Sequence, residues 1–403
     1  MKIDKNYLDG ILIGSAIFFE VCYSQVMIPL CIIFIVRICI LFFSRIGKIK
    51  FNSLTAWLIL MYIFTSVLGL RLDDNSSQFS FIYNSCIFLS IISIQIILSN
   101  MKNDNFFIII RVSIIFSLIL LSCYLFAKES ENIFNLKDTF ISGNTGYRLG
   151  KLSSGNPNTV AWTLGIISIF IFYFFSYYKR IFYIILYFIS IIFIFLTGSK
   201  NGLLLALTPI FFELFKSFRS ISLNKVLIFA IILYFAWFII HENFTLYTLI
   251  GNRIDSMINT IEFSSGYSSN YEDIDIGSTM KRIDMIKSAI DMFLEQPIYG
   301  WGIGGFAKYS GYGYYSHSNY SEILVSGGIV LFLSYYCYIL YYILFFLFNK
   351  RRNMYRTLIA MLIVSILLMD AGTVNFYSNF IFYFRTLVLF ELVRKGMLIK
   401  NGK

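Results

Sequence analysis

Residues 315–348 read YSHSNYSEILVSGGIVLFLSYYCYILYYILFFLF, and this stretch decides the class of fold. A polar, aromatic segment carrying His317 leads directly into an apolar run, 321–348, which is long enough to cross a bilayer as a helix. Glu322 lies at the mouth of that run. A histidine and a carboxylate are costly to bury where a loop meets the bilayer, so both are candidates for function.

The composition extends this pattern to the whole chain. Of 403 residues, 58% are hydrophobic and only 14% are charged, whereas a soluble domain is about 45–50% apolar and about 25% charged. Few prolines and no two-residue alternation argue against a β-barrel. We therefore predict an all-α polytopic membrane bundle, a single membrane domain over 1–403. About twelve spans are expected, at 8–23, 25–44, 54–70, 80–99, 106–126, 159–178, 181–198, 202–215, 226–240, 321–348, 355–370 and 376–393.

Lysine and arginine near the span ends predict the orientation. They gather on one side when both termini are placed in the cytoplasm, as the positive-inside rule requires. The net charge of +11 is then mostly a topology signal, and without a concentrated soluble patch we expect no nucleic-acid binding. Two long extracytoplasmic segments remain, 127–158 and the large loop 241–320.

The cysteines and histidines do not predict a metal site. All six cysteines fall inside or beside apolar runs, and the only histidines are His241 and His317. Neither residue type has metal-ligand spacing, so the sequence predicts no metal and no cofactor.

Within the large loop, 278–295 predicts an amphipathic helix that ends before Pro297. Its apolar face would contain Ile283, Ile286, Ile290 and Phe293. A glycine-rich run follows, in which Gly302 and Gly304 could allow close approach of a ligand or could simply form a turn.

Two cations on the outer side are candidate anion ligands. Arg282, near the start of the predicted helix, could hold a diphosphate in a bidentate fork or could pair with Asp284 or Asp255. Lys200 lies in the span-breaking turn GSKNG and could bind an anionic ligand or extend to lipid headgroups.

The segment before the sixth span carries Arg148 and an Asn-Pro-Asn turn. Asn158 or Thr159 would cap the following helix, which is a sufficient account of the asparagines and leaves Arg148 unexplained. Arg148 and Asn158 are also candidate substrate-binding residues.

His317, Asn319 and Glu322 allow two interpretations. His317 could act as a general base oriented by Glu322, with Asn319 binding substrate. Alternatively, Asn319 and Glu322 have the spacing of a capping box. Asp370, at the outer end of its span, could pair with one of the three arginines that lie within spans, Arg37, Arg111 and Arg385.

Taken in order, these segments resemble the Wzy-type polymerases of O-antigen and capsular polysaccharide and the related O-antigen ligases. The matching pieces are R-x-G…N-P-N at 148–158, G-S-[RK]-x-G at 198–202, R…F-x-x-x-P-[IL]-x-G-x-G at 282–302 and H-[SN]-x…E…G at 317–327. The topology is similar as well. One departure is Lys200, where many relatives carry arginine, so that charge is kept and the planar fork is lost.

The resemblance implies a GT-C-like glycosyltransferase of the bacterial cytoplasmic (inner) membrane. Its donor would be an oligosaccharide on undecaprenyl diphosphate, and its product a longer O-antigen or capsule polymer, formed without metal. Arg282, Lys200 and Arg148 would stabilise the diphosphate, and His317 would receive the acceptor proton. Membrane lipid, a chain-length regulator and a flippase are the implied partners.

Two other activities compete with polymerisation. An O-antigen ligase would use the same donor and transfer the finished chain to a terminal acceptor. A lipid-linked glycan transporter would suit the span count, but it needs polar groups on the inner side that the sequence does not provide.

Overall fold

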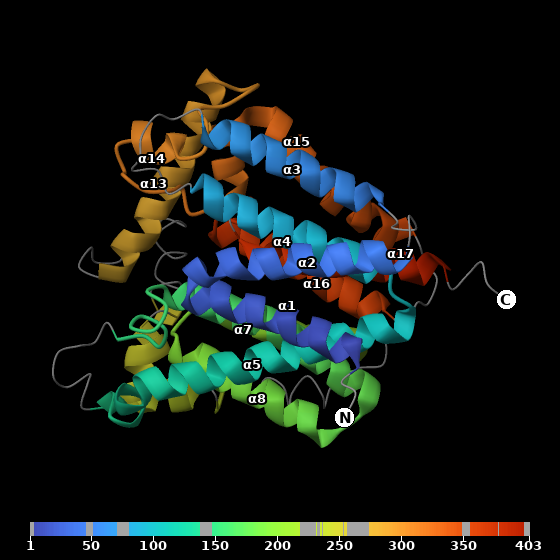
Figure 1. Ribbon diagram of the computed structural model, residues 1–403. Helices are drawn as coiled ribbons and strands as arrows, with labels where there is room; N and C mark the ends of the chain where they lie inside the picture. Colours follow the sequence, from blue (N-terminus) through green and yellow to red (C-terminus); the bar gives the residue numbers. More distant parts are fainter. Residues whose placement is uncertain are drawn as a thin grey trace. The chain divides into compact units, whose positions relative to one another are not determined.

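The computed structural model describes residues 4–45, 51–70, 80–137, 147–217, 231, 234–235, 237–252, 254–255, 274–348, 355–377 and 379–398. Every regular element in this part of the chain is helical, which confirms the all-α prediction (Figure 1). The chain divides into two compact units, one of residues 1–117 and 282–403 and the other of residues 118–281.

The first unit is built from helices of both ends of the chain. It contains α1 (Lys5–Cys22), α2 (Met27–Arg45), α3 (Ser53–Gly69), α4 (Phe81–Ser99), the start of α5 (Asn103–Phe134), most of α13 (Ile274–Glu295), α14 (Gly305–Tyr309), α15 (Asn319–Phe348), α16 (Arg356–Gly372) and α17 (Phe380–Leu398). The second unit contains the rest of α5, α7 (Pro157–Tyr178), α8 (Ile181–Leu196), α9 (Lys200–Ser217) and the short α11 (Phe244–Leu246).

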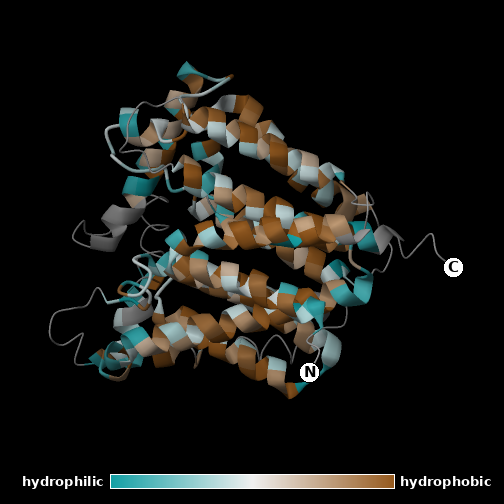
Figure 2. Ribbon diagram, in the orientation of Figure 1, coloured by the Kyte–Doolittle hydropathy of each residue, from teal (hydrophilic) through white to brown (hydrophobic). Residues whose placement is uncertain are grey.

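Long apolar helices make this a multi-pass membrane protein. In the described residues, five helical segments are long and apolar enough to span a bilayer: 24–43, 81–99, 103–134, 157–178 and 319–348. Figure 2 shows hydrophobic residues along the helices and hydrophilic ones mainly at their ends and in loops. Helices also lie at the other predicted spans, except at 226–240, which falls largely outside the described residues. The number of membrane spans, about twelve, therefore remains a prediction.

Helix ends in the first unit are joined in a way that fits the predicted topology. The Glu20 carboxylate, near the end of α1, accepts hydrogen bonds from the amides of Phe380 and Ile381 at the start of α17. At the other end of α17, Lys395 Nζ donates to the Met101 carbonyl at 2.9 Å. Both pairs join segments that were predicted to lie on the same side of the membrane.

Helix α5 is longer than its predicted span. It continues to Phe134, into the segment 127–158 that was expected to be a loop, and residues 138–146 of that segment lie outside the described residues.

Helix α15 is broken at Gly328, where φ is +62° and ψ is −162°. The glycine-rich run of the large loop packs into this break. Three hydrogen bonds join the two segments, from Trp301 N to Val325 O (2.7 Å), from Gly302 N to Ser326 O (2.8 Å) and from Ile329 N to Pro297 O (2.8 Å). Backbone groups released by the kink are therefore paired again, as buried peptide groups must be.

Gly328→Ala is expected to destabilise the protein strongly. A Cβ at Gly328 would lie 2.3 Å from the carbonyl oxygen of Ile298, in addition to the strain of a positive φ. Gly311 also has a positive φ, of +79°, but nothing lies within 4 Å of its Cβ position. Gly311→Ala should therefore cost only about 1–2 kcal/mol. Apparent melting temperatures in detergent measure both variants, and equal shifts would contradict the packing of the loop into the break.

Candidate functional site

His317 lies in the loop that precedes α15, in a left-handed backbone conformation with φ of +59°. Its ring contacts those of Tyr315 and Tyr314, with centroids 4.6 and 5.7 Å away. Burial, together with the smaller effect of the positive charge of Arg282, lowers the pKa of His317 to about 4. His317 is therefore a neutral imidazole at physiological pH, and neither ring nitrogen has a hydrogen-bond partner among the described residues.

Arg282 is exposed on α13, and the structure brings its charge close to His317. In the described part of the chain its guanidinium makes no ion pair, so the expected pairing with Asp284 or Asp255 is not observed. A free guanidinium beside a neutral imidazole is an arrangement that can bind an anion and accept a proton.

Helix α13 is held by a different face from the predicted apolar one. The buried side chains are Met285, Ala289 and Met292, which pack against Phe306 and Val325. Ile290, on the predicted face, is 46% exposed. The packed face nevertheless fixes α13, and with it Arg282, against the loop and the start of α15.

Glu322 is buried in the first turns of α15, and its carboxylate binds the backbone beside His317. Its Oε2 accepts a hydrogen bond from the amide of Ser316 at 2.8 Å. The predicted capping box with Asn319 does not form, since the amide of Glu322 donates to the carbonyl of Ser318 instead. Glu322 thus positions the His317 loop through the main chain.

Glu322→Gln is expected to keep most of the activity, because the glutamine carbonyl can still accept from the Ser316 amide. Glu322→Leu should lose about tenfold or more, since it leaves that buried amide without a partner. Initial rates of glycan transfer by the two purified variants make the comparison. A glutamine variant as inactive as the leucine variant would show that the negative charge itself is required.

Asn319 serves as a structural anchor for the same loop. Its side chain is fully buried, and its Oδ1 accepts hydrogen bonds from the amides of Asn375 (2.7 Å) and Phe376 (3.1 Å). Asp370 completes the network by accepting from Asn375 Nδ2 at 2.8 Å and from the Tyr336 hydroxyl at 2.9 Å. With its oxygen occupied and its side chain buried, Asn319 is better suited to positioning than to the predicted contact with substrate.

Of the three arginines considered as partners of Asp370, Arg385 interacts with it electrostatically, whereas Arg37 pairs with Asp9. The side chains of Asp370 and Arg385 are both buried, and their opposite charges attract each other. The polar network beneath the His317 loop therefore contains a compensating positive charge.

Gly302 and Gly304, which were predicted to contact substrate, have structural roles in the loop. Gly302 is buried, and its amide donates a hydrogen bond to the Ser326 carbonyl at 2.8 Å. Gly304, with φ of +85°, is the residue before α14. The run thus explains how the loop docks into α15.

The second unit brings together Arg148, Asn158 and the break before Lys200. Arg148 Nε donates to the carbonyl of Thr197 at 2.7 Å, and its Nη2 donates to Asn158 Oδ1 at 2.7 Å. Thr197 is the C-cap residue of α8, and Lys200 begins α9 three residues later. The two motifs expected in this region, at 148–158 and 198–202, therefore meet in space.

Two details of this region differ from expectation. The residue that caps α7 is Asn156, whose side chain accepts from the Asn158 amide, so the proposed caps Asn158 and Thr159 were wrong. Glu129, which sequence reasoning missed, is 1% exposed. Its carboxylate accepts from the Tyr147 hydroxyl (2.7 Å), the Gly150 amide (3.0 Å) and both donors of Ser153. It thereby organises the loop that carries Arg148.

Comparison with known proteins gives one family. Residues 184–336 match the Wzy_C family model, described as O-antigen ligase. This domain is shared by Wzy polymerases and O-antigen ligases, which confirms the resemblance. It spans Lys200, Arg282, His317 and Glu322, whereas Arg148 and Asn158 precede it. No curated protein matches the chain.

Proposed function

We propose that this protein, which carries a Wzy_C domain at residues 184–336, lengthens a bacterial surface polysaccharide at the outer face of the cytoplasmic membrane. Transfer of a lipid-linked glycan, of the polymerase or ligase type, follows from the family. Within that class we favour polymerisation of repeat units that are linked to undecaprenyl diphosphate. O-antigen ligation is the second candidate, because the matching family model is described as a ligase.

The observation that carries the proposal is the pair of Arg282 and His317. Arg282 is exposed and has no ion pair among the described residues, so its fork can receive diphosphate oxygens. His317 is neutral, so one ring nitrogen has a lone pair for a proton.

The reaction is a direct displacement at the anomeric carbon of the donor. A hydroxyl oxygen of the acceptor sugar forms the new bond to this carbon, while the bond from the carbon to the diphosphate oxygen breaks. The electron pair leaves with the diphosphate, where Arg282 stabilises the developing negative charge. His317 receives the hydroxyl proton or orients the hydroxyl, and Glu322 keeps the His317 loop in place through the Ser316 amide.

The cations of the second unit have a supporting role in the proposal. Arg148 is fixed by Thr197 and Asn158, so its orientation is set before substrate arrives. Together with Lys200 it offers positive charge on the side predicted to be extracytoplasmic, and we assign both to holding the lipid-linked donor.

An in vitro reaction distinguishes the two candidate activities. Purified protein in detergent receives its undecaprenyl-diphosphate repeat unit alone, or with a terminal acceptor, and the products are separated on a gel. Polymerisation predicts a ladder of lipid-linked multimers from the repeat unit alone. Transfer that occurs only with the terminal acceptor would replace the proposal by ligation.

The protonation of His317 gives a test that needs no substrate. Because the chain has only two histidines, His241→Gln leaves His317 as the sole imidazole. In this variant, labelled with ¹³C-histidine, NMR should find the imidazole neutral between pH 5 and 8, since its pKa is about 4. Adding Arg282→Gln removes a positive charge and should raise the pKa of His317, while burial still holds it below about 6.5. Half-protonation near pH 6.5 in the single variant would contradict the assigned environment.

The same environment predicts how pH affects the reaction. In the free enzyme the acid limb of kcat/KM should follow a His317 pKa near 4. Bound diphosphate offsets the charge of Arg282, so the acid limb of kcat should lie at a higher pH.

A further inference from the structure

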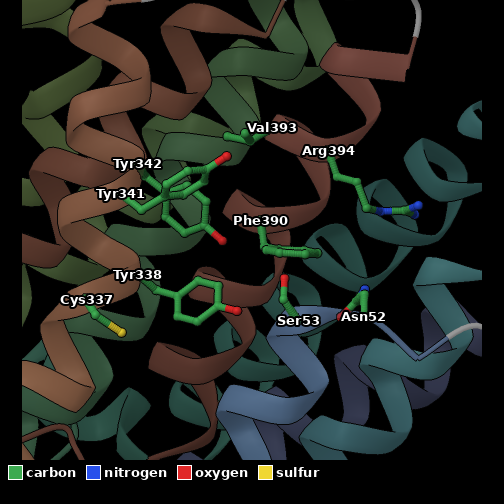
Figure 3. Close-up of a pocket in the computed structure, with 9 residues that line it drawn as sticks. All are labelled: Asn52, Ser53, Cys337, Tyr338, Tyr341, Tyr342, Phe390, Val393 and Arg394. Atoms are coloured by element: carbon green, nitrogen blue, oxygen red, sulfur yellow. The ribbon is translucent and has the colours of Figure 1, made fainter.

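Aromatic side chains line two separate features of the first unit. One is a cavity of about 510 Å³ between α3, α15 and α17, whose walls include Tyr338, Tyr341, Tyr342 and Phe390 (Figure 3). The hydroxyl oxygen of Tyr342 is itself buried, so it is not available to a ligand there. The other feature is the loop before α15, where Tyr314 and Tyr315 lie against His317. It is this loop that presents aromatic and polar groups together.

Tyr315 offers an aromatic ring and a hydroxyl group directly beside His317. The two ring centroids are 4.6 Å apart with an interplanar angle of 59°, and both side chains are half-buried. The Tyr315 hydroxyl has no hydrogen-bond partner among the described residues, and solvent can reach it. Burial raises the pKa of Tyr315, so at neutral pH the hydroxyl keeps its proton and can donate a hydrogen bond.

Tyr314 holds this surface in place against α13. Its ring packs on the buried cluster that contains Met285 and Ala289, and it meets the imidazole of His317 edge-on, with centroids 5.7 Å apart at 65°. Arg282 lies on the same helix, three residues before Met285. The aromatic surface, the imidazole and the guanidinium are therefore carried on one packed frame, as a preorganised site requires.

The geometry of the displacement decides which sugar this surface meets. The attacking and leaving oxygens lie on opposite sides of the anomeric carbon, and Arg282 serves the leaving diphosphate. The acceptor hydroxyl must come within about 3 Å of an imidazole nitrogen of His317 to give up its proton. A sugar ring held at that distance extends over the groups next to the imidazole, and of the two rings that contact His317 that of Tyr315 is the closer.

The chemistry of Tyr315 suits a sugar. A sugar ring has faces of C–H groups, which pack well on the electron-rich face of an aromatic ring, and hydroxyl groups around its edge. A tyrosine with an accessible ring and an unpartnered hydroxyl can serve both at once. Binding sites for small molecules commonly combine aromatic walls with a few placed polar groups in this way.

We propose that Tyr315 binds the acceptor sugar, with its ring against a C–H face and its hydroxyl donating to a sugar hydroxyl next to the one that attacks. The inference rests on the proposed function, because it takes His317 as the group that meets the acceptor. Tyr315 then sets the affinity for the acceptor glycan and leaves the affinity for the lipid diphosphate to Arg282.

Saturation-transfer NMR of glycan binding, without donor, tests the assignment. The probe is the repeat-unit oligosaccharide released from its lipid by mild acid. In wild type we expect the strongest saturation on the sugar at the non-reducing end, which carries the attacking hydroxyl. Tyr315→Phe keeps the ring and loses the hydroxyl, so it should raise the Kd of the glycan about tenfold. Tyr315→Leu loses both and should raise it about 100-fold.

Two controls separate this role from the rest of the site. Tyr320→Phe removes a hydroxyl that already donates to the Leu367 carbonyl, so glycan binding should not change. Undecaprenyl diphosphate binding, followed by native mass spectrometry, should weaken in Arg282→Gln and stay at the wild-type level in both Tyr315 variants.

The outcomes that overturn the inference differ from those that overturn the proposed function. Equal glycan binding by wild type and Tyr315→Leu, or saturation confined to the reducing-end sugar, would remove Tyr315 from the acceptor subsite and leave the proposed function standing. Weaker diphosphate binding in Tyr315→Phe would move the residue to the donor side. Wild-type protein that binds no undecaprenyl diphosphate would contradict the proposed function, and the inference with it.

Discussion

Arg282→Gln is expected to lower the rate of glycan transfer by about 10²–10³-fold, the usual cost of removing one preorganised donor to developing negative charge. The side chain is exposed and has no ion pair among the described residues, so the change should not affect folding. Initial rates with the purified lipid-linked repeat unit provide the measurement, and a size-exclusion profile and melting temperature check the fold.

Two further variants sharpen the test of Arg282. Arg282→Lys keeps the charge and loses the planar fork, so it should recover only part of the activity. Lys287→Gln is a matched control, because Lys287 is another exposed cation on α13 and has no role in the mechanism. Equal losses of activity in Arg282→Gln and Lys287→Gln would show that only the overall positive charge of the helix matters, and not Arg282 in particular.

His317→Asn is expected to lower the rate by about 10²–10⁴-fold, because it removes the group that receives the acceptor proton. Asparagine tolerates the left-handed backbone that this position requires, so the φ of +59° should not add strain. His241→Gln is the control, since His241 belongs to the second unit and its ring is paired with Asp255 at 3.1 Å. Long polymer formed by the His317→Asn variant at the wild-type rate would remove His317 from the reaction.

The helices could be predicted because membrane spans carry a strong local signal. Uninterrupted apolar runs placed α7 and α8 to within a few residues, and the Asn-Pro-Asn turn marked the start of α7. Both signals depend on residues that are neighbours in the chain. The same is true of the glycine run before α14, whose positive φ values at Gly302 and Gly304 explain those residue types.

The packed face of α13 could not be predicted from its periodicity. In a soluble helix the more apolar face is buried, but a helix at a membrane can expose apolar side chains to lipid. Ile290 is exposed, while the smaller or more flexible Ala289, Met285 and Met292 pack against protein.

Contacts distant in sequence were also beyond prediction. Glu129 is in α5, and its partners in the loop before α7 cannot be identified from spacing. Glu322 had a plausible local partner in Asn319, but the tertiary fold offered it the Ser316 amide. A sequence shows which polar groups need partners; it does not show which partners the fold supplies.

The central claim is that glycan leaves a lipid diphosphate at the site of Arg282 and His317. The most direct measurement is the initial rate at which the purified enzyme releases undecaprenyl diphosphate from its lipid-linked repeat unit. We predict one diphosphate lipid released for each glycosidic bond formed, at a rate at least about 100-fold lower in Arg282→Gln. New bonds without released lipid, or an unchanged rate in the variant, would contradict the account.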